Sequence, residues 1–237
     1  MGLVKSHGNM YPWITDMHTH LGGACPHQCR YCYVQAMARK LPNMKRRSTG
    51  KPYLVPREFD VAYDTGKNIF IGHLTDLFAS DIPDQWIEAI LRHCRKYPGN
   101  VYTFQSKNPK RFVDFASQYP VDSWFGTTIE TNRTDIIRRI SKAPAPIDRV
   151  IGLIMIKNAF DIGPKTFITI EPILDFDLDQ LVDLIKTARP DFVNIGADSK
   201  KHRLPEPPAE KVAELIEALK KECPEVKIKE NLDRLIK

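Results

Sequence analysis

The sequence predicts an α/β fold built from successive strand–helix units. From residue 68 onward, short segments rich in β-branched and aromatic residues alternate with longer segments whose apolar residues recur at helical spacing. Such alternation gives parallel strands joined by right-handed crossovers, which close into a full or partial barrel or open into a doubly wound sheet. Neither GxGxxG nor GxxxxGK(S/T) occurs, so a dinucleotide fold or a P-loop has no local support.

Six segments are predicted as strands because each is a short, mostly apolar run bounded by turn or polar residues. They span residues 14–19, 68–74, 101–105, 123–129, 166–170 and 191–195. Helices are predicted between and after them, at residues 33–40, 83–97, 109–118, 134–140, 147–158, 177–188 and 209–222. The helix at 83–97 carries one apolar stripe, which we expect to lie on the sheet. Its stripe consists of Trp86, Ile87, Ile90, Leu91 and Cys94.

The chain of 237 residues is expected to form one domain at positions 1–237, with its core at about 14–198 and a C-terminal helix and short strand at about 205–237. Residues 41–67 are predicted as an irregular insertion, and this is the most basic stretch of the chain. The excess of 35 Lys and Arg over 29 Asp and Glu gives a net charge of +6, which permits a polyanionic partner without requiring one.

Membrane insertion and secretion are not indicated. The longest apolar run, Val150 to Ile156, is far shorter than the ~20 residues of a membrane helix, and the first fifteen residues do not resemble a signal peptide. Five cysteines is an odd number, and three of them fall within eight residues, which favours reduced thiols or a metal over disulfides. We therefore expect a cytoplasmic protein, with Cys94 in the core and Cys223 at the surface.

Polar side chains recur where the predicted strands end. Since the carboxyl ends of parallel strands meet at one edge of a sheet or barrel, this recurrence predicts a pocket there, although any single position could equally be a helix cap or turn. These residues are His73, Thr75, Asp76, Gln105, Ser106, Lys107, Thr127, Thr128, Glu130, Glu171, Asn194 and Asp198.

The first strand leads directly into a loop in which Cys25, Cys29 and Cys32 stand as C-x3-C-x2-C. Zinc could be bound if His27 or His20 completed a tetrahedron. A cubane iron–sulfur cluster could instead take all three thiolates and leave its fourth iron open to another ligand. His18 and His20 alternate on the first strand and so should point the same way, either as ligands or as satisfied polar groups.

The C-x3-C-x2-C loop after the first strand, with an aromatic residue before the third cysteine, resembles the radical S-adenosylmethionine (radical SAM) superfamily. The string from Cys25 to Tyr33, which ends Tyr-Cys-Tyr, is similar to the spore photoproduct lyase branch. Segments 70–78, 101–109, 124–130 and 168–174 look more like a phage-encoded relative of that lyase. The resemblance spans about residues 14–198.

This resemblance implies a partial (β/α)6 barrel of the TIM type and a 4Fe-4S cluster on the three cysteines. S-adenosylmethionine would chelate the open iron, and its reductive cleavage would give a 5'-deoxyadenosyl radical that takes a hydrogen from the substrate. A reducing electron donor such as flavodoxin or ferredoxin is then required. Whether the overall reaction is of the lyase or the transferase type stays open.

The resemblance also suggests contacts to S-adenosylmethionine. Thr75 and Asp76 match the region that binds the methionyl amino group, Lys107 or Arg138 could pair with the methionyl carboxylate, and Thr128 and Glu130 could contact the ribose. The adenine would lie near Tyr31. Glu171 ends an apolar strand, so it is either a cofactor or substrate contact or half of an internal ion pair.

The substrate is expected to be a nucleic acid or a nucleotide, from the net charge, the basic insertion and the lyase-like strings. Residues 72–83 lack the hydrogen-donating cysteine that the lyase carries in that region, which argues against thymine-dimer reversal. Two alternatives remain. One is a radical SAM enzyme acting on a small molecule or peptide, and the other is a non-catalytic nucleic-acid-binding module stabilised by zinc on the three cysteines and His27.

Overall fold

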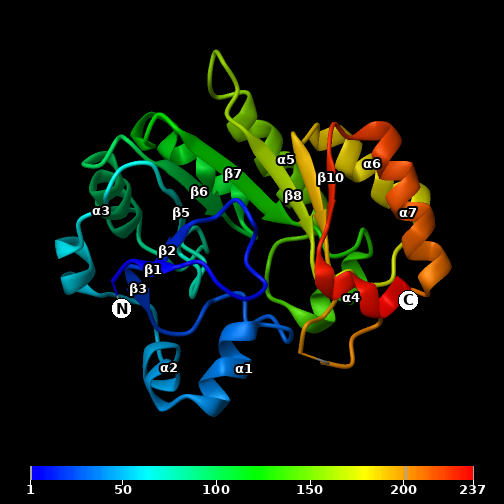
Figure 1. Cartoon of the computed structure of the whole chain (residues 1–237), viewed down its shortest axis with the longest axis horizontal. Coiled ribbons are helices and arrows are strands. Elements are labelled where there is room, and N and C mark those ends of the chain that lie inside the picture. Colours follow the sequence, from blue (N-terminus) through cyan, green and yellow to red (C-terminus); the bar gives the residue numbers. More distant parts are fainter. Residues whose placement is uncertain (1, 201, 237) are drawn as a thin grey trace.

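The computed structural model describes residues 2–200 and 202–236, and its centre is one mostly parallel sheet with helices around it (Figure 1). The strand order is β1-β2-β5-β6-β7-β8-β9-β10, and every neighbouring pair is parallel except β1 and β2. The bounds are β1 (Val4–Lys5), β2 (Asp16–His18), β5 (Asn68–Ile71), β6 (Val101–Gln105), β7 (Ser123–Thr128), β8 (Thr166–Ile170), β9 (Phe192–Ile195) and β10 (Val226–Ile228).

All six predicted strands are present, and β10 is the short strand expected near the C-terminus. The predicted α/β class is confirmed, and the open sheet corresponds to a partial barrel. Three two-residue strands were not predicted, namely β1, β3 (Leu21–Gly22) and β4 (Tyr53–Leu54). Two residues are too few to show the alternation by which a strand is recognised in a sequence.

The register of the strands separates two faces of the sheet. On the outer face, Ile71 pairs with Phe104 and with His18, and these side chains face the helices. On the inner face, Phe167 pairs with Phe192 and with Gly126. A Cβ on Gly126 would lie 2.2 Å from the ring of Phe167, so glycine is required for this packing.

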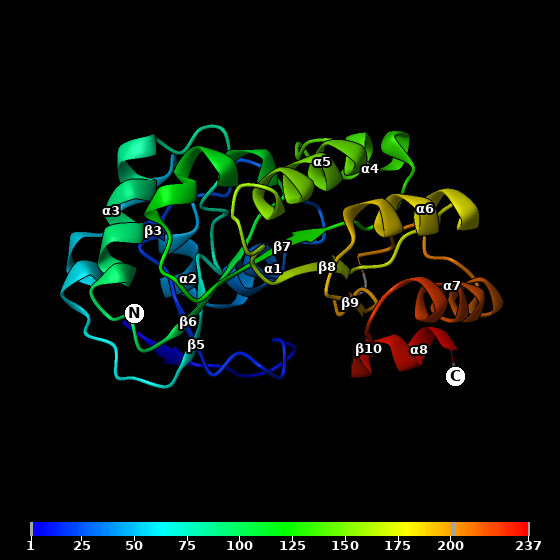
Figure 2. The same ribbon diagram turned by 90° about the horizontal axis from the view of Figure 1, so that it is seen from above.

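Helices cover the outer face, while the N-terminal segment packs on the inner face (Figure 2). Tyr11 and Trp13 stack at 4.6 Å and contact the inner aromatic side chains, which closes the base of the concave side. The helices are α1 (Tyr33–Lys40), α2 (Pro42–Arg47), α3 (Asp84–Arg95), α4 (Thr134–Ile140), α5 (Pro146–Lys157), α6 (Leu178–Ala188), α7 (Ala209–Glu222) and α8 (Asp233–Ile236). The predicted apolar stripe of α3 is confirmed, because Ile87, Ile90, Leu91 and Cys94 lie in the main core.

The segment predicted as a helix at 109–118 is a 3-10 helix, η2 (Pro109–Gln118), which is kinked at Phe115. Phe112 and Phe115, three residues apart, are both buried, and a 3-10 helix places such residues directly above one another. A Cβ on Gly152 of α5 would lie 2.3 Å from the backbone nitrogen of Lys110, so the two helices meet backbone to backbone. This close approach is a tertiary contact that the local pattern does not reveal.

The basic insertion is more ordered than predicted. It contains α2, β4 and the 3-10 helix η1 (Pro56–Asp60), and β4 pairs antiparallel with β3. The backbone nitrogens of Gly23 and Ala24 donate to the carbonyls of Arg47 and Gly50, at 2.7 and 2.9 Å. The insertion therefore holds the start of the cysteine loop.

The expectation that Cys223 lies at the surface is wrong. Cys94 lies in the core as predicted, but Cys223 is also buried, because it follows Leu219 by four residues and continues the apolar stripe of α7. In the part of the chain that the structure describes, no helix has the length and apolarity needed to cross a membrane.

Candidate functional site

The cysteine loop runs from β3 to α1, and its three thiols are unequal. Cys29 is buried, with its Sγ 3.1 Å from the hydroxyl of Ser141, while Cys25 and Cys32 are partly exposed. Burial and the nearby charge of Asp76 raise the pKa of Cys25 to about 12. Burial also raises the pKa of Cys32, although the backbone N–H groups at the start of α1 oppose that shift.

Both flanks of the loop are fixed by backbone contacts. Gly23 has a φ of +92°, and a Cβ there would lie 2.3 Å from the carbonyl oxygen of Lys51, so only glycine fits. The nitrogen of Arg30 donates to the carbonyl of Ile140 at 2.8 Å, which attaches the loop to the end of α4. The conformation is therefore set by glycine geometry and by two distant segments.

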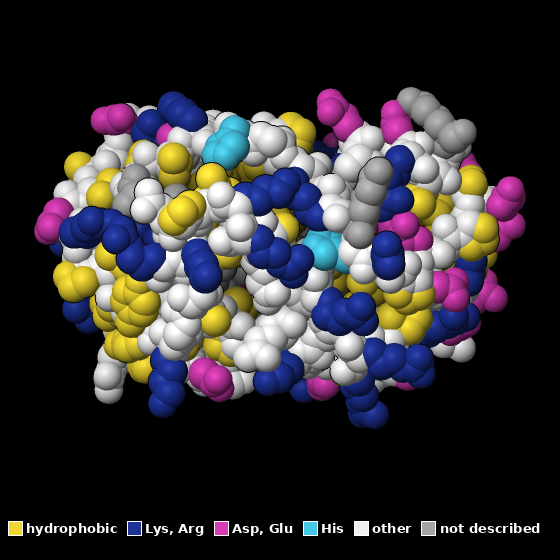
Figure 3. Space-filling view, turned by 90° about the horizontal axis from the view of Figure 1, so that it is seen from below, with side chains coloured by type: hydrophobic (Ala, Val, Ile, Leu, Met, Phe, Trp, Pro, Cys, Tyr) yellow, Lys and Arg dark blue, Asp and Glu magenta, His cyan; other side chains and the backbone are white. Residues whose placement is uncertain are grey.

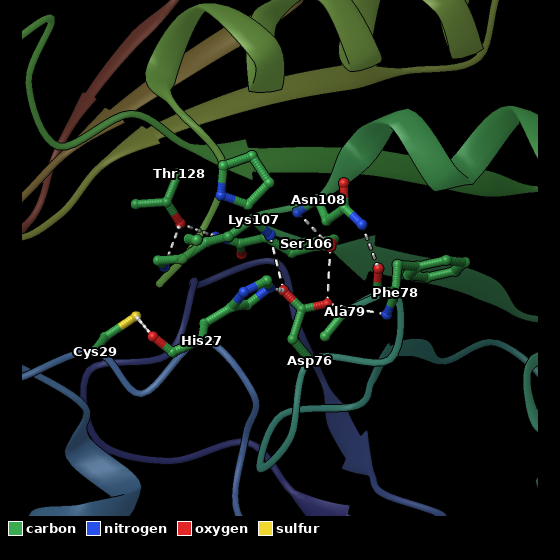
Figure 4. Close-up of polar contacts among 12 residues, drawn as sticks. His27, Cys29, Asp76, Phe78, Ala79, Ser106, Lys107, Asn108 and Thr128 are labelled. Atoms are coloured by element: carbon green, nitrogen blue, oxygen red, sulfur yellow. Dashed lines mark hydrogen bonds and ion pairs between the residues drawn. The ribbon is translucent and has the colours of Figure 1, made fainter. Parts of the chain in front are cut away.

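His27, between the first two cysteines, is the side chain that connects the loop to the end of β5. Its Nε2 lies 3.0 Å from Oδ2 of Asp76 (Figure 4). Asp76 also accepts hydrogen bonds from the Ser106 hydroxyl at 2.7 Å and from the backbone nitrogens of Lys107 and Phe78. Burial would raise the pKa of Asp76, but His27 and these donors lower it to about 2.

Tyr31 connects the loop to the end of β7. Its hydroxyl donates to Glu130, which is fully buried and pairs with Nη1 of Arg149 at 2.7 Å. The Nζ of Lys107 lies 3.7 Å from Glu130 and over the ring of Tyr31. Burial alone would raise the pKa of Glu130, but Arg149 and Lys107 lower it, so the carboxylate is ionised.

A polar layer continues from Lys107 across the inner face of the sheet. Lys107 Nζ lies 3.1 Å from Oγ1 of Thr128, which also accepts a hydrogen bond from Gln105 at 3.0 Å. The hydroxyl of Tyr11 then joins Gln105 to Thr169, at 2.8 and 2.7 Å. Gln105, Lys107 and Thr128 stand at the carboxyl ends of β6 and β7, where barrel enzymes bind their ligands.

The structure brings most of the predicted site residues together around the cysteine loop. Tyr31, Asp76, Lys107, Thr128 and Glu130 belong to the contacts above. Thr75 joins them because its hydroxyl donates to the carbonyl of Gly23 at 3.1 Å.

Two predicted residues lie elsewhere. Arg138 is exposed near the end of α4, and none of the contacts above involves it. Glu171 forms an internal ion pair with Lys229 at 2.7 Å and accepts hydrogen bonds from Asn9 and Asn231. This arrangement matches the ion-pair alternative for Glu171.

Sequence reasoning missed Arg149 and Ser141. Arg149 is fully buried on α5, where its Nη1 also donates to the carbonyl of Thr128. A lone arginine directly before the apolar run 150–156 was a signal that could have indicated a buried ion pair. Ser141 had no comparable signal, because its role comes only from the position of the α4 terminus.

The loop offers a suitable donor set for an iron–sulfur cluster. Three thiols come from eight residues, and two of them are accessible from outside the fold. Tetrahedral zinc would bring the sulfurs to within about 4 Å of one another. Among the described residues, no cysteine belongs to a group of three or more ligand atoms that lie within 4.8 Å of one another. Three thiols are enough for a cubane cluster, whereas tetrahedral zinc would need a fourth ligand such as His27.

The fold is that of radical SAM enzymes. A spore photoproduct lyase mutant with bound AdoMet and dinucleoside spore photoproduct is similar, with a TM-score of 0.66 at 9% identity over 94% of this chain and 78% of that chain. Streptococcus suis SuiB bound to precursor peptide SuiA gives a TM-score of 0.55 at 12% identity, covering 89% and 48% of the two chains. Methylornithine synthase (PylB) gives 0.54 at 15% identity, covering 93% and 66%.

In sequence, residues 21–152 match the family described as "Protein of unknown function (DUF5131)". This match covers more than half of the chain, and the chain belongs to that family. It begins at β3 and ends within α5, so it contains the cysteine loop, the basic insertion and the polar ends of β5, β6 and β7. No curated protein matches the chain.

Proposed function

We propose that this chain is a radical SAM enzyme in which Cys25, Cys29 and Cys32 hold a 4Fe-4S cluster. The observation that carries the proposal is the position of the cysteine loop, which lies across the carboxyl ends of the parallel strands. His27 attaches it to the end of β5 and Tyr31 attaches it to the end of β7. When bound, the reduced cluster supplies the electron that cleaves S-adenosylmethionine, whose radical fragment takes a hydrogen from the substrate.

The chain's own side chains then position the cofactor. Lys107 is the cation that faces the loop, so we assign it, rather than Arg138, to the methionyl carboxylate. Thr128 would contact the ribose from the same layer, and the ring of Tyr31 would pack near the adenine. Thr75 and Asp76 stay the predicted contacts of the methionyl amino group, and both also hold the loop in place.

Anaerobic reconstitution with iron and sulfide tests this function. After reduction by dithionite with S-adenosylmethionine present, we expect about four irons per chain and formation of 5'-deoxyadenosine. Cys29→Ala should lose both, whereas Cys223→Ala is a matched control outside the loop and should keep both. Bound zinc without iron, together with intact S-adenosylmethionine, would overturn the proposal and favour the zinc-stabilised binding module.

For the substrate, we propose a nucleic acid or a nucleotide. Arg46, Arg57 and the partly exposed ring of Tyr53 line a cavity of about 470 Å³ between α2 and β4. Tyr53 pairs with Gly22 at the entry to the cysteine loop, so the cavity adjoins that loop. Cations beside an accessible aromatic ring suit phosphates and a stacked base. On this side of the molecule, Lys and Arg side chains extend across the surface (Figure 3).

The similar structures do not indicate one class of substrate. Two of them are described with a dinucleoside and with a peptide, and the third is methylornithine synthase. Binding of a fluorescent single-stranded oligonucleotide at increasing salt addresses the question directly. We expect affinity to fall steeply with salt, and to fall further in an Arg46→Ala/Arg57→Ala variant. A Lys220→Ala/Lys221→Ala variant removes two charges from α7 and serves as the control. Salt-independent or absent binding would favour a small molecule or a peptide.

A reducing protein is also needed, and we propose a flavodoxin or ferredoxin. Cys25 and Cys32 are partly exposed, and this exposure supports the approach of an electron donor to their side of the loop. Replacing dithionite by a reduced flavodoxin in the 5'-deoxyadenosine assay tests this directly.

A further inference from the structure

Three buried histidines form a second cluster on the other side of the sheet. His18 ends β2, His20 follows two residues later, and His93 lies on α3. Each is at most 2% exposed, and one ring nitrogen from each lies within 4.8 Å of the other two. His18 pairs with Ile71 in the register of the sheet, so its side chain faces α3 and not the inner face. The cluster is therefore separate from the polar layer proposed to bind S-adenosylmethionine.

The hydrogen bonds fix which ring nitrogens carry protons. The Nε2 of His93 donates to the carbonyl oxygen of Val61 at 3.0 Å, and the Nε2 of His18 donates to the carboxylate of Glu58 at 3.1 Å. The Nδ1 atom of each ring must then carry a lone pair. Metal-ligating histidines are typically oriented in this way, with the outer N–H bound to a carboxylate or a backbone carbonyl.

Those two lone pairs converge on the hydroxyl of Tyr63, at 2.5 Å from His18 and 3.3 Å from His93. Because a hydroxyl has only one proton, it satisfies one of the two nitrogens, and His93 receives its other hydrogen bond from Nε2 of His20 at 2.8 Å. Nδ1 of His20 is buried and has no hydrogen-bond partner among the described residues. The network thus has more acceptors than donors.

We propose that His18, His20 and His93 bind a divalent first-row transition-metal ion, with Zn²⁺ as the ion that fits best. Imidazole nitrogens are preferred ligands of Zn²⁺, and the oxygen of Tyr63 is placed to be the fourth ligand. A bound ion would replace the hydrogen bonds that Nδ1 of His18 and Nδ1 of His93 accept from Tyr63 and His20, and Glu58 would offset part of its charge. Since the buried ligands lie on β2, directly after β2 and on α3, the ion joins these segments and has a structural role.

The experiment uses the full chain with the cysteine loop disabled, as Cys25→Ala/Cys29→Ala/Cys32→Ala, so that the thiols cannot account for bound metal. The protein is treated with a chelator, loaded with Zn²⁺ or Co²⁺, desalted, and assayed by elemental analysis and visible absorption. We expect about one ion per chain, a Co²⁺ spectrum of tetrahedral type, and an increase in melting temperature with Zn²⁺. This readout does not depend on the proposed radical SAM activity.

Two variants make the assignment specific. His20→Gln removes the ring with the unpartnered nitrogen and should weaken Zn²⁺ binding at least about 100-fold, while His7→Gln, an exposed histidine, should leave it unchanged. Circular dichroism in chelator confirms that each variant is folded. If the cysteine-free chain does not fold, the same titration is made on wild-type protein reconstituted with iron and sulfide. Absence of stoichiometric metal, or equal retention in His20→Gln, would overturn the proposal.

Discussion

The imidazole of His27 and the carboxylate of Asp76 lie 3.0 Å apart, and this contact joins the cysteine loop to the end of a strand 49 residues later in the chain. The carboxylate of Asp76 also accepts hydrogen bonds from Ser106 and from the backbone of Lys107, at the end of the next strand. One buried side chain therefore fixes three segments around the proposed cluster.

Asp76→Asn should loosen the cysteine loop without removing a cysteine. The amide oxygen can still accept hydrogen bonds, but the negative charge that strengthens the hydrogen bond with His27 is lost, so we expect the free energy of unfolding to fall by about 1.5–3 kcal/mol. Iron retained after reconstitution should fall as well. Urea unfolding and iron analysis measure the two effects. Asp64→Asn, at a side chain that is 93% exposed, is the matched control, and equal losses in both variants would contradict the prediction.

Glu130→Gln should be strongly destabilising, because it leaves the buried guanidinium of Arg149 without its anionic partner. Breaking one side of a fully buried pair costs about 3–5 kcal/mol. Denaturant unfolding of the metal-free protein measures this cost. Asp135→Asn breaks the exposed pair with Arg139 and should change stability by no more than about 0.5 kcal/mol. Similar losses of stability in the two variants would contradict the prediction, because they would show that Arg149 does not depend on the charge of Glu130.

Lys107→Met and Arg138→Met distinguish the two candidates for the methionyl carboxylate. Lys107 faces Tyr31 and Thr128, so its loss should weaken S-adenosylmethionine binding about tenfold or more. Arg138 is exposed on α4, and its loss should change the dissociation constant less than about twofold. Calorimetric titration of reconstituted protein with S-adenosylmethionine measures both constants. The reverse order of effects would assign the carboxylate to Arg138.

Protonation of His73 should make the protein less stable in mild acid. Burial, assisted by the charge of Arg47, lowers the pKa of His73 to about 4 from an ordinary value of 6.5. Between those pH values the unfolded chain binds the proton that the folded protein excludes. Stability is therefore fully present above about pH 6.5 and is lost as the pH falls towards 4, by at most about 3 kcal/mol.

Urea unfolding at several pH values between 7 and 4 tests this for the wild type and for His73→Gln. A glutamine can keep a hydrogen bond to Thr19, which lies 2.9 Å from Nδ1 of His73, but it does not titrate. The variant should show a flatter pH dependence in this window. Parallel curves would mean that other groups cause the acid sensitivity.

The fold could be predicted largely from local sequence, since strands β6 and β8 and helices α1, α4 and α7 have the predicted bounds. Their apolar residues follow periods of two or 3.6, which is local information. The close approach of Gly152 to the backbone of Lys110 in η2 could not be predicted, because it joins segments more than 30 residues apart. The two-residue strands β3 and β4 exist only because their segments pair with each other.

By itself the sequence determined the parallel α/β architecture and the C-x3-C-x2-C loop, because periodicity and cysteine spacing are properties of neighbouring residues. Only the tertiary structure decided which polar groups meet. It placed Lys107 at the loop and Arg138 in solvent, gave Glu171 to Lys229, and buried Arg149 beside Glu130. It also brought His93 to His18 and His20, which precede it by 75 and 73 residues in the chain. The physical reason is that ion pairs and ligand sets depend on distances in space, which chain folding sets and local sequence does not encode.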